Sequence, residues 1–156
     1  HRGFRVSELS ADDLQDLSNA RLLLESHALR QSIALGDDDW EAAVVASYHR
    51  LSRATQRLRD GVDGAFDEWE TRNREFHEAL VSRCNSSWIL SMLETLNRHS
   101  ERYRRAALAA NTPRDVQSEH TALMDAALAR DADRAVSILA DHVMTTVDVI
   151  ADASTA

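Results

Sequence analysis

Apolar residues recur at spacings of three and four along almost the whole chain, the spacing that places them on one face of a helix. The alternation of β-branched and polar residues that is typical of strands does not occur. The chain contains only four glycines and one proline, so few helix breakers interrupt the pattern. We therefore expect an all-α protein.

The breakers and the capping residues divide this pattern into six expected helices. Ser10, followed three residues later by Asp13, resembles a capping box that opens the first helix. Thr112 is the expected N-cap of the fifth helix, with Pro113 at its first position. The expected boundaries are 10–36, 38–60, 65–83, 87–109, 113–130, and from 131 or 133 to 151.

Polar residues interrupt the apolar faces of three of these helices. The third helix carries Asn73 on its apolar face, and His77 follows one turn later. His120 lies in the middle of the apolar face of the fifth helix, and His142 lies in the same place on the sixth. Three helices therefore each present one central imidazole to the interior.

Three buried imidazoles are difficult to satisfy, because each ring nitrogen needs a partner and these helix faces carry few other polar groups. A divalent metal ion resolves this, since imidazole is the commonest protein ligand for such ions. We predict that Asn73, His77, His120 and His142 hold zinc, with nickel or manganese as alternatives. The other interpretation is that each histidine bonds a backbone carbonyl separately, as an ordinary core residue.

Arg21 stands on the apolar face of the first helix, where an inward cation needs an anion. Glu25, one turn later, supplies one within the helix, and an acidic ligand is the alternative. A guanidinium donates two parallel hydrogen bonds to a carboxylate, so Arg21 is a candidate contact for a carboxylate effector. His99, which shares an expected inner face with Met92, and Arg102 on the same helix are grouped with Arg21 as candidate effector-binding residues.

Composition and charge narrow the possible classes of function. A chain of 156 residues suits one domain with a continuous core. The net charge of −8 argues against a surface for nucleic-acid phosphates on this chain. Cys84 is the only cysteine, which excludes an internal disulfide and multi-thiolate metal sites and fits a reducing, cytoplasmic location. No apolar run is long enough to span a bilayer, so we expect no membrane partner.

The ordered set of motifs resembles the FCD effector-binding domain, the C-terminal half of the fatty-acid-regulator branch of GntR transcriptional regulators. The resemblance covers essentially the whole chain. Its motifs are Gly3-Phe4-Arg5-Val6 leading to Ser10, Arg21 with Leu24-Glu25, Asn73 with Phe76-His77, Asn85, Glu119-His120 with Ala126 or Ala127 and Asp131, and Ala135 followed by His142.

The resemblance implies an antiparallel bundle of six to seven helices, with a divalent metal held by an acidic residue and three histidines. It also implies a small organic acid bound at that centre, a homodimer, and control of operator DNA by an N-terminal winged helix-turn-helix domain absent from this chain. In this interpretation residues 1–9 are the linker from that domain, residues 10–151 form the metal- and effector-binding domain, and residues 152–156 are a polar tail.

Asn73 stands where the family more usually has an aspartate. A neutral amide oxygen holds a metal ion less tightly and leaves the site one charge more positive. We therefore expect weaker metal retention and stronger attraction for an anionic effector. Glu70, one turn earlier, is an alternative oxygen donor.

Two other classes of function use the same residues. A metal-dependent enzyme of the hydrolase or oxygenase type also employs several histidines and a coordinated water. The Glu-x-x-His and His-Glu-x-x-His patterns that are typical of such enzymes do not occur in this sequence. We also expect the side chains of Glu119 and Asp141 to point toward solvent. We therefore predict that the protein is not an enzyme. The second alternative is a structural or dimerising helical module without a ligand.

Overall fold

The computed structural model describes residues 10–108 and 115–154, and this part of the chain forms six helices and no strand. The prediction of an all-α protein is therefore confirmed. None of the described helices combines the length and the apolar character that crossing a bilayer requires. The helices are α1 (Ala11–Leu35), α2 (Asp38–Arg59), α3 (Ala65–Val81), α4 (Ser87–Leu108), α5 (Val116–Leu128) and α6 (Ala132–Ser154).

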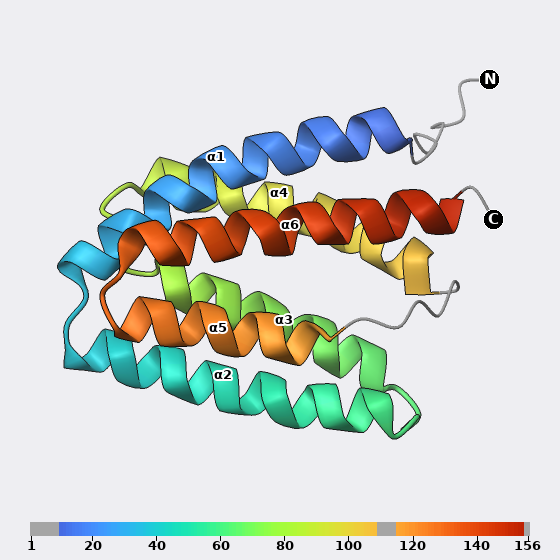
Figure 1. The fold of residues 1–156 in the computed structure, drawn as a ribbon, viewed down its shortest axis with the longest axis horizontal. Coiled ribbons are helices and arrows are strands. Elements are labelled where there is room, and N and C mark those ends of the chain that lie inside the picture. The colour runs from blue at the N-terminus through green and yellow to red at the C-terminus, as the bar shows by residue number, and fades with distance from the viewer. Residues whose placement is uncertain (1–9, 109–114, 155–156) are drawn as a thin grey trace.

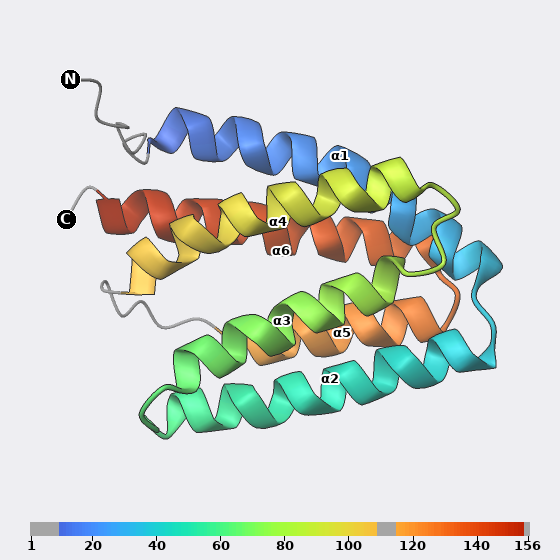
Figure 2. The same ribbon diagram turned by 180° about the vertical axis from the view of Figure 1, so that it is seen from behind.

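The helices form an antiparallel bundle of two layers, in which successive helices run in opposite directions (Figure 1). One layer contains α1, α4 and α6, and the other contains α2, α3 and α5 (Figure 2). Contacts of α6 with α5 and of α1 with α3 join the layers. The three helices that carry the predicted histidines, α3, α5 and α6, therefore meet across the boundary between the layers.

Side-chain caps set most of the helix starts, as the sequence predicts. The Ser10 hydroxyl accepts a hydrogen bond from the Asp13 N–H at 3.0 Å, and the Ser86 hydroxyl accepts one from the Ile89 N–H at 3.2 Å. The start of α5 differs, because it begins at Val116 with Asp115 as its N-cap.

Three of the expectations concern residues at or beyond the ends of the described segments. The expected cap and proline at 112–113 lie outside the described residues, as do the expected linker at 1–9 and its motif at 3–6. At the other end, α6 continues to Ser154 and so includes most of the expected polar tail.

The main core lies between the two layers, and several of its large side chains are fully buried. Phe76, Leu123 and Leu139 come from the same three helices as the predicted histidines and are each at most 1% exposed. A smaller second cluster lies where α1 begins and α6 ends, and it contains Leu14, Tyr103, Val147 and Ile150. We call this second group the end cluster.

The inner face of α4 is rotated from the one that the apolar pattern predicts. His99 is exposed and Met92 is 50% exposed, whereas Leu93, Ser100 and Tyr103 are buried. A buried serine is tolerated because the Ser100 hydroxyl donates to the Leu96 carbonyl of its own helix at 2.9 Å. The prediction that His99 and Met92 share the inner face was therefore wrong.

A polar contact between α2 and α5 fixes the orientation of α5. The hydroxyl groups of Tyr48 and Thr121 lie 2.6 Å apart, and the Gln117 amide donates to the Tyr48 hydroxyl at 2.9 Å and to the Ser52 hydroxyl at 3.0 Å. Gln117 and Thr121 are one turn apart and flank His120. Because hydrogen bonds are directional, this contact sets the rotation of α5 about its own axis.

The turn between α1 and α2 depends on a close approach at Gly36. A Cβ atom at this position would lie 2.4 Å from the Trp40 ring and 2.7 Å from the Ser32 carbonyl oxygen. Trp40 is 1% exposed, and its indole N–H donates to the Ala79 carbonyl at 3.1 Å, so the ring cannot move away without losing that bond.

We expect Gly36→Ala to lower the free energy of unfolding by about 1–3 kcal/mol, because the added methyl group overpacks this turn. Urea denaturation measures the loss. In a Trp40→Leu background the same substitution is expected to cost less, since the ring is gone and only the close contact with the Ser32 carbonyl remains. An equal cost in both backgrounds would contradict the steric explanation.

Candidate metal centre

His77, His120 and His142 converge at the centre of the bundle, where α3, α5 and α6 meet. One ring nitrogen from each lies within 4.8 Å of the others. The ring centroids are separated by 4.8–5.8 Å, and the residues are 3%, 0% and 7% exposed. Nitrogens that bind one ion at ordinary distances of about 2.0–2.1 Å lie at most about 4.2 Å apart, so the three rings need only small side-chain movements to close on one ion.

The orientation of His77 is set by a buried carboxylate from α1. The Nδ1 atom of His77 donates to Glu25 Oε1 at 2.8 Å, and Arg21 Nε donates to Glu25 Oε2 at 2.8 Å. Since a carboxylate only accepts, the proton of the neutral imidazole lies on Nδ1 and the lone pair lies on Nε2. This is the tautomer that a metal ligand requires.

The charges of this buried group are fixed by its contacts. Burial opposes the ionisation of Glu25, but the Arg21 guanidinium and His77 outweigh it and hold the pKa of this carboxyl well below its usual range. Burial lowers the pKa of His77 and outweighs the effect of the Glu25 carboxylate, so the imidazole is neutral near pH 7. Glu25 therefore joins a buried cation to a neutral imidazole.

A second carboxylate orients His142 in the same way. His142 Nδ1 donates to Glu119 Oε1 at 2.9 Å, which directs its Nε2 atom toward the other histidines. The side chain of Glu119 is 26% exposed, so the expectation that it points away to solvent was wrong. Asp141 is exposed, as expected.

Two buried atoms at the centre have lone pairs and no hydrogen-bond partner among the described residues. They are Asn73 Oδ1 and His77 Nε2. Asn73 is 5% exposed and precedes His77 by one turn on α3. A buried acceptor without a donor is costly, and a cation supplies what both atoms lack. The residues present therefore fit a metal ion.

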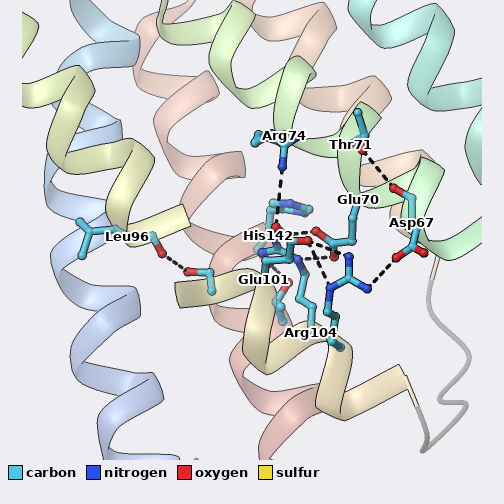
Figure 3. A network of polar contacts seen from close by, with 11 residues as sticks. Asp67, Glu70, Thr71, Arg74, Leu96, Glu101, Arg104 and His142 are labelled. Carbon is cyan, nitrogen blue, oxygen red and sulfur yellow. Dashed lines mark hydrogen bonds and ion pairs between the residues drawn. The ribbon is translucent and has the colours of Figure 1, made fainter. Parts of the chain in front are cut away.

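Glu70, the alternative oxygen donor, is occupied by another partner. Its two carboxylate oxygens accept hydrogen bonds from Arg104 at 2.7 and 3.0 Å (Figure 3). Glu70 is 1% exposed, so this bidentate pair is buried. Asn73 is therefore the better oxygen donor in this arrangement.

A small cavity of about 10 Å³ lies beside Asn73 and His77, with room for about one water molecule. Arg21 lines it and also bonds Glu25, so the expected pairing within the helix is present, and its contact with an effector stays a prediction. The expected effector residues His99 and Arg102 are exposed and do not line this cavity. The remaining lining residues are Arg74, Asn97, Glu101 and Arg104.

Several residues of the site were not assigned from the sequence. Arg104 and Arg74 lie on helices rich in charged residues, where spacing alone does not distinguish them from solvent-exposed arginines. Glu25 was recognised only as a partner of Arg21. The available signal was its position on the apolar face of α1, because a carboxylate so placed needs more than one donor.

Comparison with known families identifies the class of this protein. The model of the FCD domain matches residues 16–145. The chain therefore belongs to the FCD domain family, the C-terminal domain of GntR-family transcriptional regulators.

Two curated relatives match almost the whole chain. The uncharacterised HTH-type transcriptional regulator BphR of Paraburkholderia xenovorans is 49% identical over 151 residues, which cover 96% of this chain and 61% of the relative. The HTH-type transcriptional repressor GlaR of Escherichia coli is 35% identical, over 97% of this chain and 70% of the relative. The chain thus spans about three-fifths of the length of BphR.

Solved structures agree with this assignment. A GntR-family transcriptional regulator from Pseudomonas syringae superposes with a TM-score of 0.75 and 27% identity, over 93% of this chain and 58% of that one. E. coli McbR/YncC superposes with a TM-score of 0.79 over 93% of this chain and 71% of that one, and at 18% identity it supports the fold alone.

We expect Glu25→Gln to lower the free energy of unfolding of the metal-free protein by about 3–5 kcal/mol, because it leaves the buried Arg21 cation uncompensated. Glu68→Gln is the matched control. Glu68 pairs with Arg57 at the surface, so its loss is expected to cost less than about 1 kcal/mol. Similar losses for the two variants in urea denaturation would show that the Glu25 network does not stabilise the interior.

Proposed function

We propose that this chain is the effector-sensing domain of a GntR-family regulator and binds a small organic acid beside a metal ion. The proposed ligands of the ion are His77, His120, His142 and Asn73. The observation that carries the proposal is the convergence of three buried imidazoles on one point. Zinc is the proposed ion because it suits nitrogen and oxygen donors in a four-ligand set, and nickel and manganese are alternatives.

The protein contributes orientation and charge to this site. Glu25 and Glu119 hold the Nδ1 protons of His77 and His142, so both rings present their Nε2 lone pairs. When bound, the metal ion supplies a Lewis acid that accepts oxygen donors of the effector. Arg21 lines the cavity beside these ligands and attracts an effector carboxylate to the same place.

The route from the cavity to the DNA-binding domain is proposed to run through α4. Glu101 and Arg104 line the cavity, and Tyr103 between them belongs to the end cluster. The Tyr103 hydroxyl donates to Asp13 in the first turn of α1. A displacement of α4 is therefore transmitted to the beginning of α1, on the side where we propose that an N-terminal winged helix-turn-helix domain holds operator DNA. An effector changes DNA binding only to the extent that it binds one position of α4 more tightly than the other.

We also propose that the regulator is a homodimer. The support is a set of exposed apolar side chains on two helices that pack against each other. These are Leu23 on α1, which is 74% exposed, and Trp88 and Met92 on α4, which are 76% and 50% exposed. Large apolar side chains exposed on neighbouring helices are a common feature of interfaces.

The relatives decide between a regulator and an enzyme. BphR and GlaR are both transcriptional regulators, which favours sensing over the hydrolase or oxygenase alternative. A structural module without a ligand remains as the other alternative, and the following experiment separates it from a sensor.

We expect His77→Ala, His120→Ala and His142→Ala each to weaken metal retention at least about tenfold, because each removes a ligand. The measurement is elemental analysis of the purified protein after dialysis against a graded chelator. His27→Ala and His49→Ala are the matched controls, since both histidines are exposed on α1 and α2. Unchanged retention in all three core variants would remove the assigned site.

The metal-loaded protein should also gain thermal stability from an organic acid, whereas the metal-free protein should not. A thermal-shift panel of hydroxy acids, dicarboxylates and sugar acids tests this. Turnover of a panel member would support the enzyme alternative. Absence of both metal and shift would support the structural module.

A further inference from the structure

Helix α4 has two different kinds of neighbour. On one side it packs against α1 and α6, where Tyr103 lies in the end cluster with Leu14 of α1 and Val147 of α6. On the other side it faces α3, which it approaches closely at few places. We call this second boundary, from Asp67 to Arg74 on α3 and from Glu101 to Arg105 on α4, the α3–α4 seam.

Three ion pairs cross the α3–α4 seam, each with one partner on either helix. They are Arg104 with Glu70 at 2.7 Å, Arg105 with Asp67 at 2.7 Å, and Arg74 with Glu101 at 3.8 Å (Figure 3). The described side-chain hydrogen bonds between the two helices all belong to the first two pairs. Charge rather than apolar packing therefore holds α3 and α4 together.

The same two helices also meet in a repulsive contact, beyond the cavity. Burial raises the pKa of the Glu78 carboxyl on α3, Arg74 lowers it, and the carboxylates of Glu94 on α4 and Glu75 raise it further. Glu78 and Glu94 are thus like charges that face each other across the two helices. The attraction that keeps the helices together is confined to the three ion pairs of the seam.

The cavity beside Asn73 and His77 lies along this seam. Apart from Arg21 of α1, all of its lining residues belong to α3 or α4. Those that are partly exposed are Arg74, Asn97, Glu101 and Arg104, whereas Arg21, Asn73 and His77 are buried. The cavity is therefore nearest to solvent where α3 and α4 meet.

The seam costs less free energy to open than the other boundaries of α4. The side chains of Asp67 and Arg105 are 75% and 45% exposed, and exposed ion pairs contribute little to stability. Arg104 and Glu70 are buried, but both charges enter water together when the seam opens, so each regains its hydration. Separating α4 from α1 or α6 instead exposes apolar surface, whose cost rises with the area.

We infer that the α3–α4 seam is the entrance to the cavity, held shut by ion pairs and opened when α4 turns on its apolar contacts with α1 and α6. Tyr103 stays in the end cluster during this movement, while Glu101 and Arg104 move away from α3. The inference goes beyond the proposed function, because it concerns access to the cavity and does not depend on what the cavity binds.

The rate at which a thiol in the cavity wall reacts tests this inference on the metal-free protein. In a Cys84→Ala background, which removes the native thiol, Asn73→Cys places a thiol at a position that is 5% exposed. Methyl methanethiosulfonate, a small neutral reagent, modifies the thiol when the seam opens, and mass spectrometry measures the rate. Asn97→Cys, on the α4 side of the cavity, is the second reporter if Asn73→Cys does not fold.

We expect Arg105→Gln and Asp67→Asn each to raise the rate of this reaction about two- to fivefold, the effect of losing one exposed ion pair. The double variant should react no faster than the faster single variant, because both substitutions remove the same pair. The two substitutions change the charge in opposite directions, so they shift the pKa of a nearby thiol in opposite directions as well. A shared acceleration therefore reports opening of the seam.

Two controls separate opening of the seam from unfolding. Ala126→Cys places the thiol at a position of α5 that is 0% exposed, so its reaction reports global unfolding and should be unchanged in both seam variants. Arg57→Gln removes a pair of similar exposure between α2 and α3 and should leave the cavity thiol unaffected.

The outcomes decide the inference independently of the proposed function. Acceleration of the cavity thiol in both seam variants, without acceleration in either control, supports the entrance. Failure of either seam variant to accelerate the reaction, or an equal acceleration in a control, would overturn it. The proposed metal site would stand in that case, because metal retention is measured separately.

Discussion

The carboxylate of Glu25 is the contact on which the polar interior depends. It accepts from Arg21 on one side and from His77 on the other, so a single buried anion compensates a cation and fixes a tautomer. Neither partner is stable in this place without it, because a buried cation needs an anion and a buried imidazole needs a defined donor and acceptor. Helix α1 is thereby tied to the centre of the bundle by a charge as well as by apolar packing. The stability of the fold and the orientation of the His77 ring consequently depend on the same carboxylate.

The site combines rigid and loosely held charges. Arg21 and Arg104 are locked in short, buried pairs, while Arg74 lies at the edge of the cavity in a long contact. The Arg21–Glu25 pair orients the His77 ring, whereas the loosely held Arg74 guanidinium is freer to change partner. The helix that carries Arg104 also carries Tyr103 into the end cluster, so the cavity and the start of α1 share one element.

Most of the fold was predictable from the sequence because apolar spacing and caps are local signals. The starts of α2, α3 and α4 at residues 38, 65 and 87 agree with prediction, and the three histidines were recognised because each interrupts an apolar face.

The failures have physical causes. Helix α4 carries apolar residues around much of its circumference, so spacing alone did not select Ser100 over His99 as the inward residue. Glu119 was placed in solvent because a sequence does not show that the neighbouring helix brings His142 within 2.9 Å of it. Partners supplied by another helix are the part of a site that periodicity does not reveal.

The hydroxyl and amide contact between α2 and α5 has a consequence for how this domain tolerates change. Tyr48, Gln117 and Thr121 do not line the cavity, yet their contact sets the rotation of the helix that carries His120 into the interior. Turning so short a helix by a few degrees shifts the His120 ring by about half an ångström relative to its two neighbours. Under the proposed function, amino-acid replacements at this outer seam of the bundle therefore tune metal affinity at a distance.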